Sequence, residues 1–233
     1  MWDDVLVAKQ RKIFEIRRGR PRPPRRRRTP EAARQELLDA AERVFGDFNP
    51  DHVGLVDIAR EAGVSHALIT HYFGTYAGLV EATLERRIRR LREQILSKLR
   101  EAGAVARPND LLGVVFRALE DPVHVRLVKW MLASDRPSAA RAFALQDQGL
   151  QDVARMVATA IEPEPTRRHI ETIELALATA VAAAYGYAIS KYALAGALGR
   201  QASSELDADI QSTLASMLRA YLRAELGPIV PAT

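Results

Sequence analysis

The sequence predicts an all-α protein, built from a small amino-terminal helix-turn-helix unit and a larger helical domain. Apolar residues recur every three or four positions along most of the 233 residues, and no segment shows the strict alternation of a half-buried strand. Residues 60–73 read R-E-A-G-V-S-H-A-L-I-T-H-Y-F, which places a short turn between two helical segments. With 48% apolar residues, the chain is long enough to form two hydrophobic cores.

The first predicted helix begins after Thr29. A hydroxyl at the cap, Pro30 at the first helical position and Glu31 near the positive end of the helix dipole form a start signal. Helical spacing relates the apolar residues that follow, namely Leu37, Leu38, Ala41, Val44, Phe45 and Phe48. We expect this helix to end near Asn49 and Pro50.

The two helices of the motif are predicted at residues 55–62 and 65–73. Gly63 follows the first of them, where a left-handed residue is needed and glycine adopts that conformation without strain. Ser65 is predicted to cap the second helix through its side chain. Helices joined by so short a turn must cross, and in DNA-binding proteins of this kind the second helix enters the major groove.

The rest of the chain is predicted to be helical as well. Thr75 is the expected cap of a fourth helix, which runs to about Gly103. Prolines and glycines then separate further apolar-periodic segments. These segments lie at about 110–120, 122–134, 138–161, 166–198 and 205–226. Leu175 to Leu198 has the length of a membrane span, but it is rich in Ala and contains Lys191, so we expect a packed helix and no membrane partner.

Charge is distributed unevenly along the chain. Residues 1–30 carry eleven Lys and Arg against three carboxylates, a net charge of +8, while the remainder sums to −3. Residues 31–61 are acidic, with eight carboxylates against three arginines. We predict that the basic arm attracts DNA phosphates. The contacts proposed within it are Arg18, Arg20, Arg25 and Arg26. The alternative is a solvated, disordered tail.

Part of this arm, Arg18-Gly19-Arg20-Pro21, resembles the core of an AT-hook. An extended backbone without a side chain at Gly19 lets the flanking arginines enter a narrow A·T minor groove, where the negative potential is concentrated. A match of four residues in an Arg-rich and Pro-rich background also arises by chance. Both readings of this segment stay open.

Several function classes are excluded by what the sequence lacks. Without Cys there is no disulfide, no thiolate nucleophile and no Cys-based zinc site, which fits a reducing cytoplasm. No Gly-rich phosphate loop, nucleophile elbow or paired-acid motif is present, and no signal peptide is visible. His66 and His71 lie five residues apart, which does not place both on one helix face for a metal. We therefore expect no enzyme, no metal and no cofactor.

Four motifs together resemble the TetR family of bacterial regulators. They are A-A-x-x-x-F at residues 40–45, I-A-x-x-A-G-V-S at 58–65, Y-F at 72–73, and a leucine early in the fourth helix, Leu79. We expect three domains: the basic arm at residues 1–29, disordered or extended and with its AT-hook-like core, and, as the resemblance implies, a helix-turn-helix domain at 30–77 and an effector-binding and dimerisation domain at 78–233. It further implies a cytoplasmic homodimer, associated with the nucleoid when bound, that represses palindromic operators until a small hydrophobic effector releases it.

The resemblance also implies which residues contact DNA. They are Ser65, His66, Ala67, Thr70, His71, Tyr72 and Tyr76. Several of them depart from the family pattern. His66 and Ala67 stand where Lys or Gln and then Gly or Pro are common, Thr70 stands where Tyr is usual, and Tyr76 replaces a phosphate-contacting Lys. We therefore expect the basic arm to replace contacts that this unit lacks, while Ile69 and Phe73 face its core.

The larger domain offers two sets of candidate residues. A ligand pocket is predicted among Phe116, Trp130, Met131, Phe143, Met156 and Tyr185, which otherwise are simply core. A dimer interface is predicted from the small residues of segment 171–198 and the last helix. Its members are Ala182, Gly186, Ile189, Leu214, Leu218 and Tyr221. The alternative is that these small residues pack within one subunit.

Two functions therefore remain in view. The first is a ligand-responsive repressor that reads a specific sequence. The second is an architectural protein that coats A·T-rich DNA through its arm, with low specificity and without a ligand switch.

Overall fold

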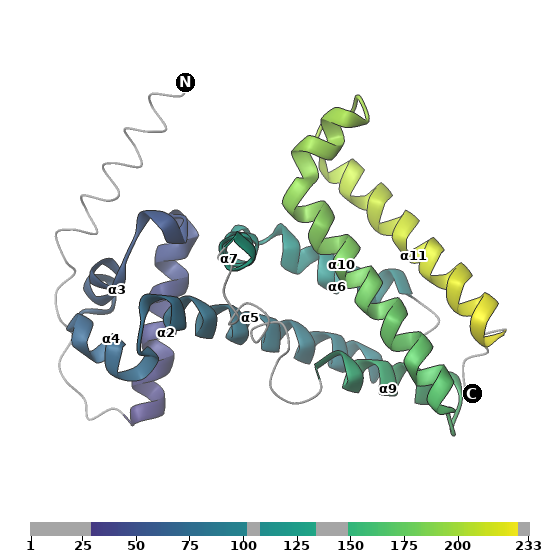
Figure 1. Ribbon diagram of the computed structural model, residues 1–233, viewed down its shortest axis with the longest axis horizontal. Helices are drawn as coiled ribbons and strands as arrows, with labels where there is room; N and C mark the ends of the chain where they lie inside the picture. The colour runs from purple at the N-terminus through teal and green to yellow at the C-terminus, as the bar shows by residue number, and fades with distance from the viewer. Residues whose placement is uncertain (1–28, 102–107, 134–148, 228–233) are drawn as a thin grey trace. The chain divides into compact units, whose positions relative to one another are not determined.

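The computed structural model describes residues 29–101, 108–133 and 149–227, and every regular element within these ranges is a helix (Figure 1). The predicted all-α fold is confirmed for this part of the chain. The chain forms two compact units. The first contains residues 29–86 and 126–133, and the second contains residues 87–101, 108–125 and 149–227. Arg18, Arg20, Arg25 and Arg26 lie outside the described residues.

The first unit contains the helix-turn-helix. Its elements are α2 (Pro30–Asp47), the 3-10 turn η1 (Pro50–His52), α3 (Leu55–Ala62), α4 (His66–Phe73) and the beginning of α5 (Tyr76–Leu99). Thr29 caps α2 as predicted, because its Oγ1 accepts a hydrogen bond of 3.2 Å from the Ala32 amide. Thr75 caps α5 in the same way, accepting a bond of 3.0 Å from the Gly78 amide.

Fully buried apolar side chains hold this unit together. α2 supplies three of the largest, and α3, α4, α5 and α7 (Pro122–Ala133) supply the others. The largest of these side chains are Leu37, Leu38, Phe45, Ile58, Ile69, Leu79, Leu84, Leu127 and Met131. Burying a Leu, Ile or Phe side chain stabilises a fold by about 1.5–3 kcal/mol each. The helix-turn-helix is therefore a rigid platform and not a loose hairpin of helices.

A buried arginine joins α5 to α2. The Arg86 side chain is 9% exposed. Its Nη1 lies 2.7 Å from Asp39 Oδ1, and its Nη2 lies 2.6 Å from Glu42 Oε1. Its Nε donates a further bond of 2.9 Å to the same Glu42 oxygen. These bonds tie α5 to α2 within the first compact unit, which includes residues up to Arg86.

A distant segment of the chain completes the first unit. From α7 (Pro122–Ala133), Arg126 donates hydrogen bonds of 2.8 Å and 2.5 Å to the carbonyls of Phe45 and Gly46. These carbonyls belong to the last turn of α2, where no intrahelical donor is available. Trp130 adds an edge-on contact to the Tyr76 ring, with centroids 6.1 Å apart. The carboxyl-terminal part of α7 thus belongs to this unit.

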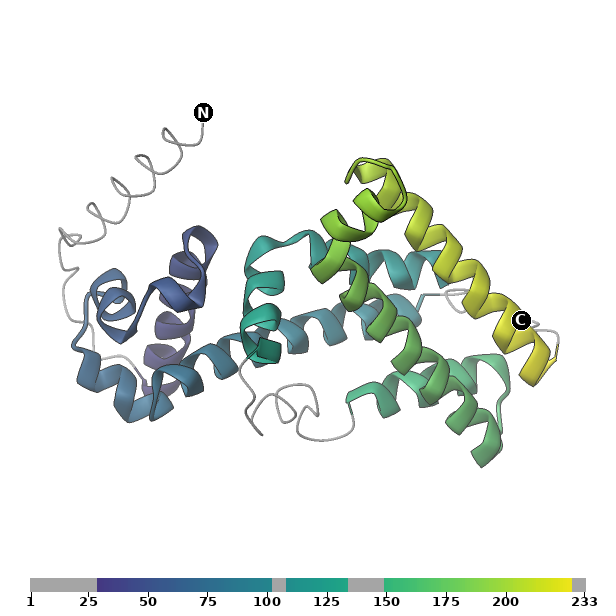
Figure 2. The same cartoon turned by 45° about the horizontal axis from the view of Figure 1, so that its top comes forward.

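The second unit is a helical bundle. It contains the remainder of α5, α6 (Pro108–Glu120), the start of α7, α9 (Gly149–Ile161), α10 (Arg167–Ala197) and α11 (Ser204–Leu226). Figures 1 and 2 both show α10 and α11 side by side, and these helices contact each other and α6. The predicted helix boundaries match closely, except that α5 ends at Leu99. Residues 138–148 of one predicted helix lie outside the described part.

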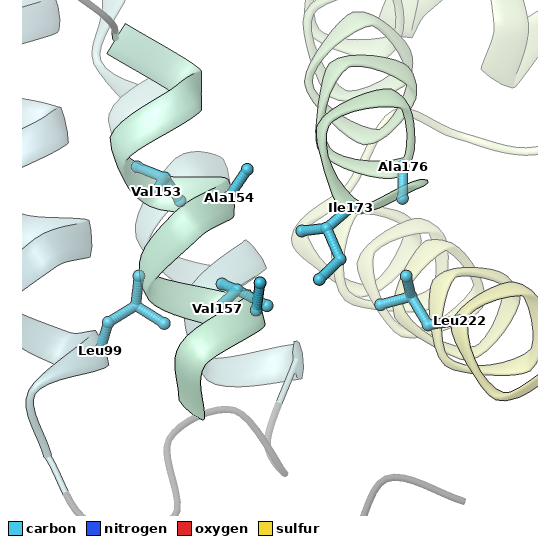
Figure 3. Packing of buried hydrophobic residues seen from close by; sticks show 8 residues of the cluster. Leu99, Val153, Ala154, Val157, Ile173, Ala176 and Leu222 are labelled. Atoms are coloured by element: carbon cyan, nitrogen blue, oxygen red, sulfur yellow. The ribbon is translucent and has the colours of Figure 1, made fainter. Parts of the chain in front are cut away.

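Alanines lie among larger apolar side chains in the core of this bundle (Figure 3). One buried cluster joins α5, α9, α10 and α11. Its members are Leu99, Val153, Ala154, Val157, Ala158, Ile173, Ala176 and Leu222. Small residues at a helix contact bring the backbones together, so that larger neighbours such as Ile173 interdigitate between them. These contacts make α9 and α10 neighbours in the core.

α10 is long and apolar enough, by length and composition alone, to cross a membrane. It also carries a polar anchor in its second half. Lys191 Nζ lies 2.6 Å from Asp207 Oδ2, and the Tyr187 hydroxyl donates a bond of 2.8 Å to Asp207 Oδ1. Both bonds tie α10 to α11. Lys191, noted in the sequence as unsuited to a membrane span, thus has a defined partner within the bundle.

Replacing Arg86 with Met will destabilise the first unit by about 2–3 kcal/mol, because the largely buried Glu42 carboxylate loses its bonds to the guanidinium. Thermal unfolding of Arg86→Met and the parent chain measures this loss. Arg89→Met is the matched control, because Arg89 is exposed on the same helix. Equal unfolding temperatures for the two variants would contradict the role assigned to Arg86.

Candidate nucleic-acid interface

The turn between α3 and α4 has the geometry that the sequence predicts. Gly63 is left-handed, with φ of 68° and ψ of 31°. Its amide donates to the Arg60 carbonyl at 3.1 Å, and the next amide, of Val64, donates to the Ala59 carbonyl at 2.9 Å. Such bonds close the end of a helix and fix the direction of the chain that leaves it. α4 therefore starts at a defined angle to α3.

Ser65 stands at the cap position of α4 but does not cap it with its side chain. Its backbone is extended, with φ of −78° and ψ of 148°, and its carbonyl accepts a bond of 3.1 Å from the Leu68 amide. The predicted side-chain cap is wrong. The closed turn at Gly63 already fixes the start of α4, so the fold does not require that hydrogen bond. Ser65 is exposed at the beginning of the helix.

α4 has one buried and one exposed face. Ile69 is fully buried and Phe73 is half-buried, as the sequence predicts. The guanidinium of Arg34 lies 5.3 Å above the Phe73 ring. The exposed positions are Ser65, His66, Ala67, Thr70 and His71. Because residues three and four apart share a helix face, these side chains form one continuous surface. Five of the seven predicted contact residues are brought together there.

Tyr72 and Tyr76, the other two, differ in their surroundings. Tyr72 is half-buried, and its ring meets the His71 ring edge-on with centroids 5.3 Å apart. The Tyr76 hydroxyl donates a bond of 2.6 Å to the Pro50 carbonyl. Burial, and secondarily the charges of Asp51 and Asp57, raise the pKa of the Tyr76 hydroxyl. Tyr76 must give up its bond to Pro50 before it can donate to a phosphate.

Charge pairing limits what this unit offers to a polyanion. Arg43 lies 2.7 Å from Glu61, Arg60 lies 3.3 Å from Asp57, and Arg86 is bonded to Asp39 and Glu42. Asp57 also accepts a bond of 3.0 Å from the Gly54 amide at the start of α3. These arginines form ion pairs within the unit, so they are less available to bind DNA phosphates. The exposed face of α4 is therefore suited to contacts with bases more than to phosphate neutralisation.

The predicted ligand-pocket residues are divided between the two units and the undescribed part of the chain. Trp130 and Met131 belong to the first unit. In the second, Phe116 packs against Tyr187, whereas Met156 packs against the cluster around Val157. The remaining two are Tyr185, which shares a hydrogen bond of 2.8 Å with His124, and Phe143, which lies outside the described residues. Apolar spacing identifies core faces, but it does not say which core a residue joins.

The predicted dimer residues are divided between exposed and packed positions. Ala182 and Gly186 are exposed on α10, and a Cβ added at Gly186 would meet nothing within 4 Å. Tyr221 is 43% exposed on α11. Ile189 is half-buried, and Leu214 and Leu218 pack partly against clusters of their own subunit. Further exposed apolar residues lie on these two helices or directly after α10, namely Leu175, Tyr192, Leu194, Leu198 and Met217.

The described residues contain no group of three or more His, Asp and Glu side chains placed to hold a metal ion. The geometry of α3, the Gly63 turn and α4 defines the class of this protein, a helix-turn-helix protein. Residues 37–83 match the family model for bacterial regulatory proteins of the tetR family. Residues 37–83 therefore carry the amino-terminal domain of the TetR family, and the described residues have an all-helical fold like that of its solved members.

Individual relatives agree with this assignment. The HTH-type transcriptional regulator BetI of Cronobacter sakazakii is 32% identical over 114 residues, which is 46% of this chain and 56% of the relative. The chain spans about half the length of the curated relatives it matches. Two solved structures share the fold. A tetR-family transcriptional regulator from Streptomyces coelicolor has a TM-score of 0.55 at 22% identity, covering 85% of this chain and 90% of that one. A TetR transcriptional regulator from Rhodococcus sp. RHA1 has a TM-score of 0.56 at 17% identity, covering 82% and 96%.

Proposed function

We propose that this chain is a DNA-binding transcriptional regulator, a homodimeric repressor of palindromic operators that a small ligand releases. One observation carries the proposal, the continuous exposed face of α4 on a rigidly packed unit. The naming of its relatives as HTH-type transcriptional regulators supports the same conclusion. A helix displayed in this way places its amino-terminal side chains on base edges when it enters the major groove.

The chemistry of the exposed face fits direct reading of bases. His66 and His71 each carry ring nitrogens that donate to or accept from base edges, and the Ala67 methyl packs against a thymine methyl. Thr70 directs its hydroxyl proton to the His66 carbonyl at 3.2 Å, so its oxygen is held in place as an acceptor. Specificity resides in these side chains, because the arginines of the same unit are engaged with its own carboxylates, with backbone carbonyls and with Phe73.

We assign much of the affinity to the basic arm. With eleven cations against three carboxylates in residues 1–30, it has the charge that the acidic helix-turn-helix lacks. Each cation that reaches a phosphate releases a counterion, so binding depends steeply on salt. The architectural alternative uses the same arm but leaves the α4 face without a role. The exposed polar surface of α4 favours the repressor.

The dimer is assigned to α10 and α11. Along α10, Leu175, Ala182 and Gly186 are exposed at helical spacing, and Met217 and Tyr221 are exposed on α11. An exposed apolar surface of this extent is uncommon on a monomer, and a second copy packed on it by two-fold symmetry forms a four-helix interface. Two recognition helices related in this way read the two halves of a palindrome.

In footprinting on an operator selected from a random duplex pool, His66→Ala will weaken specific binding by about tenfold, because one base contact is lost from each half-site. His52→Ala is the control, since His52 is exposed in the same unit away from α4. A specific footprint of the parent chain must persist under excess random duplex. Its loss under competition would favour the architectural function.

Deleting residues 1–28 will lower operator affinity and flatten the dependence of binding on salt, because fewer phosphates are neutralised. Titrations at several salt concentrations give both quantities from one data set. The position of the footprint will not change, because α4 still selects the sequence. An unchanged affinity together with an unchanged salt slope would remove the role proposed for the arm.

Gly186→Arg will shift the chain toward monomer, because a charged side chain at the centre of the proposed interface must be buried against its copy. The isolated subunit has room for it, since nothing lies within 4 Å of an added Cβ. Sedimentation equilibrium at micromolar concentration measures the change, with the exposed Ala208→Arg on α11 as control. A monomeric parent chain would refute the dimer.

A further inference from the structure

The second unit contains a pocket of about 370 Å³ with an unusual concentration of positive charge. It lies among α5, α6 and the start of α7. Arg87, Arg90 and Arg117 line it with three guanidinium groups, and Asp121 contributes the only carboxylate of its lining. The sequence analysis did not predict a ligand contact at any of these residues. The polar lining contrasts with the apolar pocket that the sequence analysis expected.

Helix geometry explains how these side chains gather. Arg87, Arg90 and Gln94 are spaced three and seven residues apart on α5, so they share one face of that helix. Arg117 comes from α6, where Gly113 precedes it by one turn. A Cβ at Gly113 would lie 3.3 Å from Arg117 Nη1, so the missing side chain gives this guanidinium room beside the α6 backbone.

Asp121 organises the pocket without neutralising it. One carboxylate oxygen pairs with Arg87 Nη2, and the other accepts a bond of 2.8 Å from the Val123 amide at the start of α7. The carboxylate therefore holds Arg87 in place while it caps a helix. Three guanidinium groups against one carboxylate leave the lining with an excess of positive charge, to which Arg90 and Arg117 contribute.

His124 forms a neutral part of the wall. It is 2% exposed and shares a hydrogen bond of 2.8 Å with the Tyr185 hydroxyl. Burial, and then the positive charge of Arg87, lower the pKa of His124 to about 4, although Asp121 acts in the opposite direction. The imidazole is thus uncharged at neutral pH.

We propose that this pocket binds a small organic anion, a molecule with a carboxylate or phosphate group and a compact apolar body. Guanidinium groups form paired hydrogen bonds with both kinds of oxyanion, and the volume suits a small metabolite. Leu91 and Ala118 provide apolar contacts for the body of the ligand. The charge of the lining excludes cations. The anion is the releasing effector, a role that rests on the proposed function.

Calorimetric titration of the full chain without DNA tests the site itself. The probes are benzoate and phenyl phosphate as anions, benzamide as the neutral analogue and benzylamine as the cationic one. At least one anion will bind at least tenfold more tightly than benzamide, and benzylamine will not bind. Preference for phenyl phosphate over benzoate, or the reverse, identifies the oxyanion. Equal binding of benzamide and both anions, or no anion binding at millimolar concentration, would overturn the proposal.

Variants locate the binding. The double variant Arg90→Gln with Arg117→Gln will weaken anion binding at least tenfold, whereas Arg89→Gln on the same helix will not, because Arg89 does not line the pocket. Arg90 and Arg117 are both exposed, so the fold will tolerate the change, and matching thermal unfolding curves check this. Unchanged affinity in a folded double variant would place the anion elsewhere and refute the site.

A separate measurement connects the site to regulation. The bound anion, added to a preformed complex with operator DNA, will release the DNA from the parent chain but not from the double variant. Absence of specific DNA binding in the first place would contradict the proposed function and leave the anion titration intact. Anion binding without release would refute the effector role alone.

Discussion

The buried guanidinium of Arg86 is the interaction on which the amino-terminal unit depends. It is bonded to Asp39 and Glu42 of α2, and a charge so far removed from water is tolerated only when it is paired in this way. The pairing fixes the beginning of α5 against α2. The pairing also neutralises part of the negative charge of an acidic unit. Without it, the carboxylates of the unit would repel one another and would repel DNA more strongly.

The pairing of arginines with carboxylates of the same unit also affects the chemistry of the candidate DNA interface. The arginines of the helix-turn-helix serve its own stability, so the exposed face of α4 presents histidines, a methyl group and hydroxyls. Such side chains discriminate bases well and attract phosphates weakly. The proposed division of labour follows, in which α4 selects the sequence and the basic arm supplies long-range attraction. Tyr76 fits this picture, because its hydroxyl serves the fold through Pro50.

In the second unit, polar and apolar surfaces occur in different places. The face of α10 and α11 exposes Leu175, Met217 and Tyr221, which suits a second copy of the chain. The pocket among α5, α6 and the start of α7 instead presents three guanidinium groups, which suits an anion. Together the two proposals describe a dimer whose ligand differs in character from a purely hydrophobic effector.

The helices, the Gly63 turn, the outward positions of α4 and the burial of Ile69 could be predicted from the sequence alone. These features depend on local spacing and on backbone preferences that neighbouring residues decide. The tertiary structure was needed to show that Ser65 does not cap α4 with its side chain and that Trp130 belongs with Tyr76. It also gathered Arg87, Arg90 and Arg117 into one pocket. Contacts between residues far apart in the chain depend on how helices pack, and helical periodicity is the same whichever neighbour a face meets.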